Sequence, residues 1–113
     1  SWRFAQAGSK HVVISAPEKV ASYYQVDGEL SLDQITNNIQ DVDLILVEGY
    51  KNAHKPTIEV IRSQVYQEII SDPKYCLAIV SDMHIHTTLP LFGLNDIHGI
   101  SNFIIQIISN RSA

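Results

Sequence analysis

Two carboxylates directly follow apolar runs that are typical of buried strands. Glu48 follows residues 44–47 (Leu-Ile-Leu-Val), and Asp82 follows residues 76–81, which are mostly apolar. In α/β sheets, ligands bind outside the carboxyl ends of the strands, which is where both acids are expected. Two carboxylates there can hold Mg²⁺, because Mg²⁺ prefers oxygen ligands and keeps several waters. The alternative is that each acid is simply solvated at the end of its strand.

Positive charge gathers after the first of these acids. Lys51, Lys55 and Arg62 follow Glu48 along the chain. Ammonium and guanidinium groups at such positions can meet a phosphate or an acidic partner. An ordinary surface of mixed charge explains the same three residues, and the sequence leaves both interpretations open.

Other reactive side chains carry weaker signals. His84 and His86 share a face if the backbone is extended, but no third metal ligand is obviously placed beside them, so they are better read as loop histidines. Cys76 begins an apolar run, which favours a small core residue over a nucleophile. The sequence contains no G-x-S-x-G nucleophile elbow, no G-x-x-x-x-G-K-[ST] phosphate loop and no G-x-G-x-x-G motif.

The elements that must position these residues alternate between strands and helices. Ser31 and Gln34 form a capping-box pattern that predicts a helix start. Asn95 is the predicted cap of a last helix, whose apolar residues recur with helical spacing. Residues 63–73 fit either a helical turn or a strand. The predicted strands are 11–16, 19–28 (closed by a turn signal at Asp27 and Gly28), 42–49, 57–62 and 76–82, and the predicted helices are 31–40 and the segment after residue 95. This order predicts an α/β fold with a mostly parallel sheet and flanking helices.

Composition restricts the classes of protein to which the chain can belong. With 113 residues, of which 45% are hydrophobic and 18% charged, it has the size and composition of a single globular domain, residues 1–113. A net charge of -4 gives no general attraction to nucleic acid or to acidic membranes. No apolar run approaches the roughly 20 residues that span a membrane. The single cysteine, Cys76, fits a reducing cytoplasm.

Several stretches together resemble the adapter family of molybdopterin-guanine dinucleotide biosynthesis, the MobB type. Residues 1–15, SWRFAQAGSKHVVIS, are similar to the family's opening segment, in which Ser1, Arg3, Ala7 and Gly8 match. The most specific matches are residues 43–51 (DLILVEGYK) and 55–62 (KPTIEVIR), where Thr57 replaces the family's usual Lys. Residues 77–82 (LAIVSD) and 89–104 (LPLFGLNDIHGISNFI) resemble its closing strand, loop and helix.

The resemblance implies a P-loop NTPase-like fold that binds GTP with Mg²⁺ and has weak GTPase activity at most. It implies a cytoplasmic homodimer that assists the molybdenum cofactor guanylyltransferase, which attaches GMP to molybdopterin. Carried over to this sequence, Glu48 is the Walker-B-like acid near the metal, Gly49 lets the backbone turn close to the nucleotide, and Lys51 lies beside it. Asp82 is the candidate for selecting guanine, since a carboxylate accepts hydrogen bonds from N1 and N2 of that base.

The family's phosphate loop lies upstream of the segment that matches residues 1–15. The resemblance therefore predicts that the chain is the carboxyl-terminal portion of a P-loop nucleotide-binding domain. By itself it is expected to bind GTP poorly or not at all. The alternative function is a non-catalytic dimerisation or partner-binding module, in which Lys51, Lys55 and Arg62 meet an acidic partner or a dinucleotide.

Overall fold

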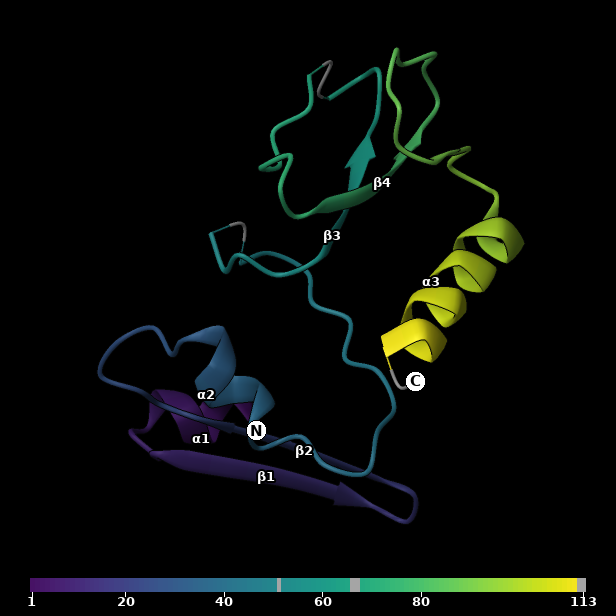
Figure 1. The fold of residues 1–113 in the computed structure, drawn as a ribbon. Helices are drawn as coiled ribbons and strands as arrows, with labels where there is room; N and C mark the ends of the chain where they lie inside the picture. The colour runs from purple at the N-terminus through teal and green to yellow at the C-terminus, as the bar shows by residue number, and fades with distance from the viewer. Residues whose placement is uncertain (51, 66–67, 112–113) are drawn as a thin grey trace. The chain divides into compact units, whose positions relative to one another are not determined.

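The computed structural model describes residues 1–50, 52–65 and 68–111. The chain divides into two compact units, Ser1–Asp41, here called the hairpin unit, and Val42–Ala113, here called the sheet unit. Each unit is described by itself, and the prediction of one domain over residues 1–113 stays a prediction. The elements, drawn in Figure 1, are α1 (Trp2–Gln6), β1 (His11–Ala16), β2 (Lys19–Tyr24), α2 (Leu32–Thr36), β3 (Thr57–Ile61), β4 (Cys76–Ser81), β5 (Leu91–Phe92) and α3 (Ile97–Arg111).

The hairpin unit is built around an antiparallel pair of strands. β1 pairs with β2 in a register that runs from His11 opposite Tyr24 to Ala16 opposite Lys19, which confirms both predicted strands, although β2 ends at Tyr24, earlier than predicted. Only Val12 of this pair is buried. The predicted capping box is present in α2, where the Gln34 backbone N–H donates to Ser31 Oγ and the Ser31 N–H donates to the Gln34 side chain. The start of α2 is therefore fixed by hydrogen bonds between residues that are close in the sequence.

The sheet unit contains a three-stranded parallel sheet in the order β3-β4-β5. The central strand, β4, is buried along nearly its whole length, with both Ala78 and Ile79 at 0% exposure. The core joins Ile61, Cys76 and Ile79, and the partly buried Met83, Ile85 and Leu89 pack against it. In the same unit, the Phe92 and Phe103 rings lie 5.5 Å apart and connect β5 to α3. The prediction of an α/β fold with a parallel sheet and helices is confirmed in this unit (Figure 1).

The predicted strand at residues 42–49 is wrong. These residues adopt no ladder with any strand among the described residues, and Leu46 is 75% exposed. An apolar run becomes a strand only when a neighbouring strand accepts its N–H and C=O groups, and the pattern of side chains does not say which neighbour that is.

Further features differ from the sequence prediction. The helix predicted at 31–40 ends at Thr36, and α1 was not predicted. The cap of α3 is Asp96 and not Asn95, because Asp96 Oδ1 accepts the Gly99 N–H at 3.0 Å. β5 falls in a segment predicted as loop, since two residues are too few for an alternating pattern to be recognised. The described part of residues 63–73 forms turns and bends, and it contains neither a helix nor a strand.

None of the helices in the described part of the chain is long and apolar enough to cross a membrane.

Candidate functional site

The carboxyl ends of the three parallel strands surround a small cavity. Its volume is about 200 Å³, and it is lined by Arg62, Gln64, Val65, Asp82 and Leu94, here called the carboxyl-edge cavity. Arg62 directly follows β3, Asp82 directly follows β4, and Leu94 lies two residues after β5. Parallel strands end at the same edge of a sheet, so residues far apart in the sequence meet there. This is the position at which open α/β sheets bind ligands.

Asp82 is oriented in this cavity by a pair of hydrogen bonds from one residue. The Ser63 backbone N–H donates to Asp82 Oδ1 at 2.9 Å, and Ser63 Oγ donates to Asp82 Oδ2 at 2.9 Å. The backbone N–H of Ser63, followed by its hydroxyl, holds the pKa of Asp82 below the ordinary value of 3.8, and Arg62 adds a weaker attraction. Asp82 is therefore ionised at neutral pH and acts only as a hydrogen-bond acceptor.

Replacing Ser63 by alanine is expected to raise the pKa of Asp82, because the hydroxyl donor is lost while the backbone donor stays. A carboxyl whose pKa is lowered in the folded state stabilises that state above its unfolded pKa. That contribution is lost as the pH falls below 3.8 and through the folded pKa, so the variant should lose less stability on acidification. An NMR titration of the Asp82 carboxyl carbon measures the shift. Ser63→Thr, which keeps the hydroxyl, is the control, and an unchanged pKa in Ser63→Ala would contradict the assignment.

Glu59 holds the connection between β3 and β4, which includes Arg62, Gln64 and Val65, against the sheet by hydrogen bonds near the end of that connection. Glu59 is only 9% exposed, and its carboxylate accepts the Ile70 N–H at 2.6 Å and the Ser71 N–H at 2.8 Å. Sequence reasoning missed this residue, although one signal was present. In a strand, Glu59 and Ile61 share a face, so a charged side chain was placed on the side that buries Ile61.

Cys76 behaves as the core residue that the sequence indicates. It is 5% exposed, and burial, followed by the nearby Glu59 charge, raises the pKa of its thiol. A raised pKa keeps the thiol protonated, and the thiolate is the nucleophilic form. Cys76 therefore contributes packing and no reactive group to the site.

Glu48 and Gly49 are absent from the lining of the carboxyl-edge cavity. Glu48 is exposed on the segment that lacks strand pairing, and it does not line the carboxyl-edge cavity. Gly49 has a φ of 87°, a left-handed conformation that favours glycine, and this agrees with a turn at that position. Lys51 lies outside the described residues. Of the three predicted binding residues that the structure describes, Glu48, Gly49 and Asp82, it places only Asp82 in the lining of this cavity.

The described residues contain no cluster of three side chains of the kinds that hold metal ions. Glu48 offers a single carboxylate, and among the residues that the structure describes no three His, Cys, Asp or Glu side chains gather closely enough to hold a metal ion. His84 and His86 likewise have no third such ligand close to them among the described residues. Mg²⁺ takes its remaining ligands from water and substrate phosphates in many proteins, so the role of Glu48 toward it stays a prediction.

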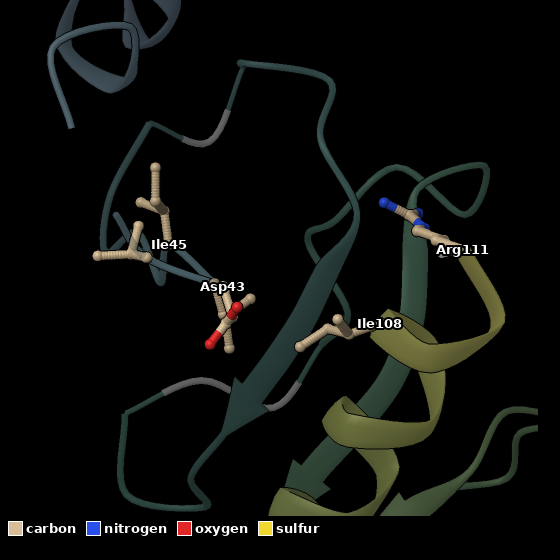
Figure 2. Close-up of a pocket in the computed structure, with 6 residues that line it drawn as sticks. Asp43, Ile45, Ile108 and Arg111 are labelled. Carbon is tan, nitrogen blue, oxygen red and sulfur yellow. The ribbon is translucent and has the colours of Figure 1, made fainter. Parts of the chain in front are cut away.

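A second cavity, of about 390 Å³, lies between residues 42–45 and α3 within the sheet unit. Figure 2 shows that Ile108 and Arg111 come from the last turns of α3, whereas Asp43 and Ile45 come from the segment after residue 41. Val42 and Leu44 complete a lining that is mainly aliphatic. Apart from the charges of Asp43 and Arg111, this lining offers no group for chemistry, so the carboxyl-edge cavity is the stronger candidate site.

Comparison with known proteins gives a consistent result. A family model described as molybdopterin guanine dinucleotide synthesis protein B (MobB) matches residues 1–82. Two curated relatives, from Haemophilus influenzae and Escherichia coli, are each named molybdopterin-guanine dinucleotide biosynthesis adapter protein. The first is 29% identical over 106 residues, which cover 92% of this chain and 60% of the relative. The second is 26% identical over 119 aligned positions, which cover 99% of this chain and 67% of the relative.

Proposed function

The chain belongs to the molybdopterin guanine dinucleotide synthesis protein B (MobB) family, and from this membership we propose that it acts as an adapter in molybdopterin guanine dinucleotide biosynthesis. The observation that carries the proposal is the match over residues 1–82, which includes Arg62 and Asp82 of the carboxyl-edge cavity. The chain spans 60% of the length of the Haemophilus influenzae relative, so the activity and partners of the whole protein enter only as part of this proposal.

In this proposal the chain assists the molybdenum cofactor guanylyltransferase, and it binds a guanine nucleotide, a molybdopterin or both. Glu48, Gly49 and Lys51 belong to the phosphate end of a GTP site in this proposal. Glu48 would contribute one carboxylate toward Mg²⁺, whose charge would balance that of the phosphates. The left-handed backbone at Gly49 supports a tight turn there, and the ammonium group of Lys51 suits a phosphate.

A second candidate function is a dimerisation or partner-binding module without nucleotide chemistry. It is favoured by the face of the hairpin that carries Val13, Val20 and Tyr24, which are 57%, 69% and 54% exposed. The β1–β2 register places these side chains on one side of the hairpin. Exposed apolar groups gathered on one face are typical of protein interaction surfaces, including those of homodimers.

Capture of the purified cognate guanylyltransferase by the immobilised chain tests the adapter proposal. Binding is expected, and the double variant Lys51→Glu/Lys55→Glu is expected to weaken it about 10-fold at low salt, because charge reversal opposes an acidic partner. Biolayer interferometry at two salt concentrations measures both effects.

The matched control is Lys10→Glu/Lys19→Glu, which reverses two exposed lysines in the hairpin unit. It should leave capture unchanged. Absence of any binding by the unmodified chain would contradict the adapter function. Capture that the Lys51→Glu/Lys55→Glu variant does not weaken would show that the contact lies elsewhere.

A further inference from the structure

We propose that the amino-terminal edge of the parallel sheet docks an acidic segment of the protein partner, with the ammonium group of Lys74 as the central contact. The surface consists of His54, Lys55, Lys74 and Tyr75, here called the amino-edge patch. The inference rests on the proposed adapter function, for which it names the contact surface and the chemistry of the segment that binds there.

Parallel pairing brings the residues of the patch to one edge of the sheet. His54 and Lys55 lie just before β3, and Lys74 and Tyr75 directly precede β4. Because β3 and β4 run in the same direction, both approaches meet at the edge opposite the carboxyl-edge cavity. The Thr57 N–H donates to the Tyr75 carbonyl oxygen at 2.9 Å, which fixes the two approaches to each other. The patch is therefore held in place by the strand pairing that builds the sheet.

The Tyr75 ring positions the charged groups of the patch. Lys74 Nζ lies over this ring, 5.4 Å from its centroid, which is a cation–π distance. The His54 ring lies 5.3 Å from the Tyr75 ring, centroid to centroid, with an angle of 49° between the two planes. Tyr75 is partly buried, whereas His54 and Lys74 are exposed. A lysine loses rotamer freedom when it binds, so an ammonium group that is already positioned binds a carboxylate at a lower entropic cost.

The backbone at His54 points to a role other than packing. Its φ is 52°, in the left-handed region that is uncommon for a residue with a β-carbon. Strained backbone of this kind persists where the surrounding structure imposes it, and it is concentrated at functional sites. The carbonyl oxygen of the next residue, Lys55, accepts the Thr57 hydroxyl at 2.8 Å, which fixes the turn that carries both side chains. The strain therefore marks the approach to β3 as a binding segment.

The charge of the patch selects an anionic partner. Lys55 and Lys74 give it two positive charges, although the whole chain has a net charge of -4. Asp72 is the acid closest in sequence to Lys74, and its Oδ1 accepts the Lys74 backbone N–H at 2.9 Å. Its carboxylate thus serves the turn before β4 and offsets only part of the positive charge. Lysine ammonium groups bind carboxylates through charge-assisted hydrogen bonds, so a short acidic segment complements the patch.

An acidic protein segment fits this surface better than a small ligand or a nucleic acid. None of the patch residues lines the carboxyl-edge cavity or the cavity beside α3, and small ligands bind mainly in concave sites. A nucleic acid would meet the net negative charge of the chain beyond the patch. Its bases would also need a free aromatic face, but Lys74 and His54 already contact the Tyr75 ring. An extended peptide with several carboxylates requires neither a cavity nor a free ring.

Fluorescence anisotropy of labelled probes mixed with the 113-residue chain tests the proposal. Octaglutamate is expected to bind at low salt, and both octaglutamine and a thymidine octanucleotide are expected to bind at least about 10-fold more weakly. Added salt should weaken octaglutamate binding, because it screens exposed charges. No binding of octaglutamate, or equal binding of octaglutamine, would overturn the proposal. Equal or tighter binding of the octanucleotide would also overturn it, since the surface would then be one for nucleic acid.

The variant Lys74→Glu is expected to weaken octaglutamate binding about 10-fold at low salt, because it places a negative charge at the centre of the patch. The matched control is Lys10→Glu, which reverses an exposed lysine of the hairpin unit and should change binding by less than about 2-fold. The unfolding midpoint of each variant checks that the fold is retained. Equal losses in the two folded variants would show that net charge alone acts, and this would overturn the proposal.

A second pair of variants tests the role of the ring. Tyr75→Leu keeps both lysines but loses the cation–π contact, so it should bind octaglutamate about 3-fold more weakly. Tyr75→Phe keeps the ring and should bind like the unmodified chain. Equal binding by folded Tyr75→Leu and Tyr75→Phe would contradict the positioning of Lys74 by the ring.

Capture of the guanylyltransferase by the same variants separates the two proposals. Lys74→Glu is expected to weaken capture, and Lys10→Glu is expected to leave it unchanged. Capture that Lys74→Glu does not weaken would overturn the patch as the contact surface and leave the adapter function standing. Octaglutamate binding without any capture would contradict the adapter function while supporting the affinity of the patch for acidic segments.

Discussion

Replacing Ile79 by alanine is expected to lower the free energy of unfolding of the sheet unit by about 2–5 kcal/mol. Ile79 is completely buried at the centre of β4, the strand that pairs on both sides. It belongs to the core with Ile61 and Cys76, so the shorter side chain would leave a cavity that β3 and β5 cannot easily fill. Because Asp82 directly follows β4, the loss should also disturb the carboxyl-edge cavity.

Urea unfolding followed by circular dichroism measures this effect. The matched control is Val60→Ala in the neighbouring strand β3, because Val60 is 58% exposed. That substitution should change stability by about 0.5 kcal/mol or less, as for most surface positions. A similar loss in both variants would contradict the position of the core described here.

Replacing Glu59 by alanine is expected to cost about 1–3 kcal/mol and to release the segment between β3 and β4. The substitution leaves the Ile70 and Ser71 N–H groups without their acceptor. Glu59→Gln should also destabilise, because its amide places a donor against one of the two N–H groups. Amide exchange at Ile70 and Ser71 should become faster in both variants, and a hydrogen-exchange experiment detects this directly.

The control for Glu59 is Glu68→Ala, since Glu68 is an exposed acid in the same connection. Its exchange rates and unfolding midpoint should stay close to those of the unmodified chain. Unchanged protection of Ile70 and Ser71 in Glu59→Ala would show that the carboxylate does not hold this segment.

Short-range patterns in the sequence predict much of the fold. The strands at 11–16, 57–62 and 76–82 and the capping box of Ser31 and Gln34 are confirmed, with boundaries shifted by a residue or so. These features depend on alternation, helical spacing and hydrogen bonds between residues that are close in the chain. The segment 42–49 has the same apolar pattern and is not a strand, because strand formation also requires a neighbour to pair with.

The candidate site is predicted only in part. Arg62 and Asp82 are recognisable as charges at strand ends, but the sequence pairs Asp82 with Glu48, whereas the structure places it with Ser63, Gln64 and Leu94. Gln64, Val65 and Leu94 carry no motif of their own. Their role follows from the parallel order β3-β4-β5, which no local pattern encodes.

The sequence by itself determined the family, the α/β class and most of the secondary structure, because these depend on residue types at fixed short spacings. Only the tertiary structure decided that the buried Glu59 accepts hydrogen bonds from the connection between β3 and β4. It also decided that Ser63 orients the carboxylate of Asp82 beside Arg62. Both outcomes depend on contacts between strands that are far apart in the sequence. The pairing of β3 with β4 brings such residues together, and the environment it creates lowers the pKa of Asp82 and buries Glu59.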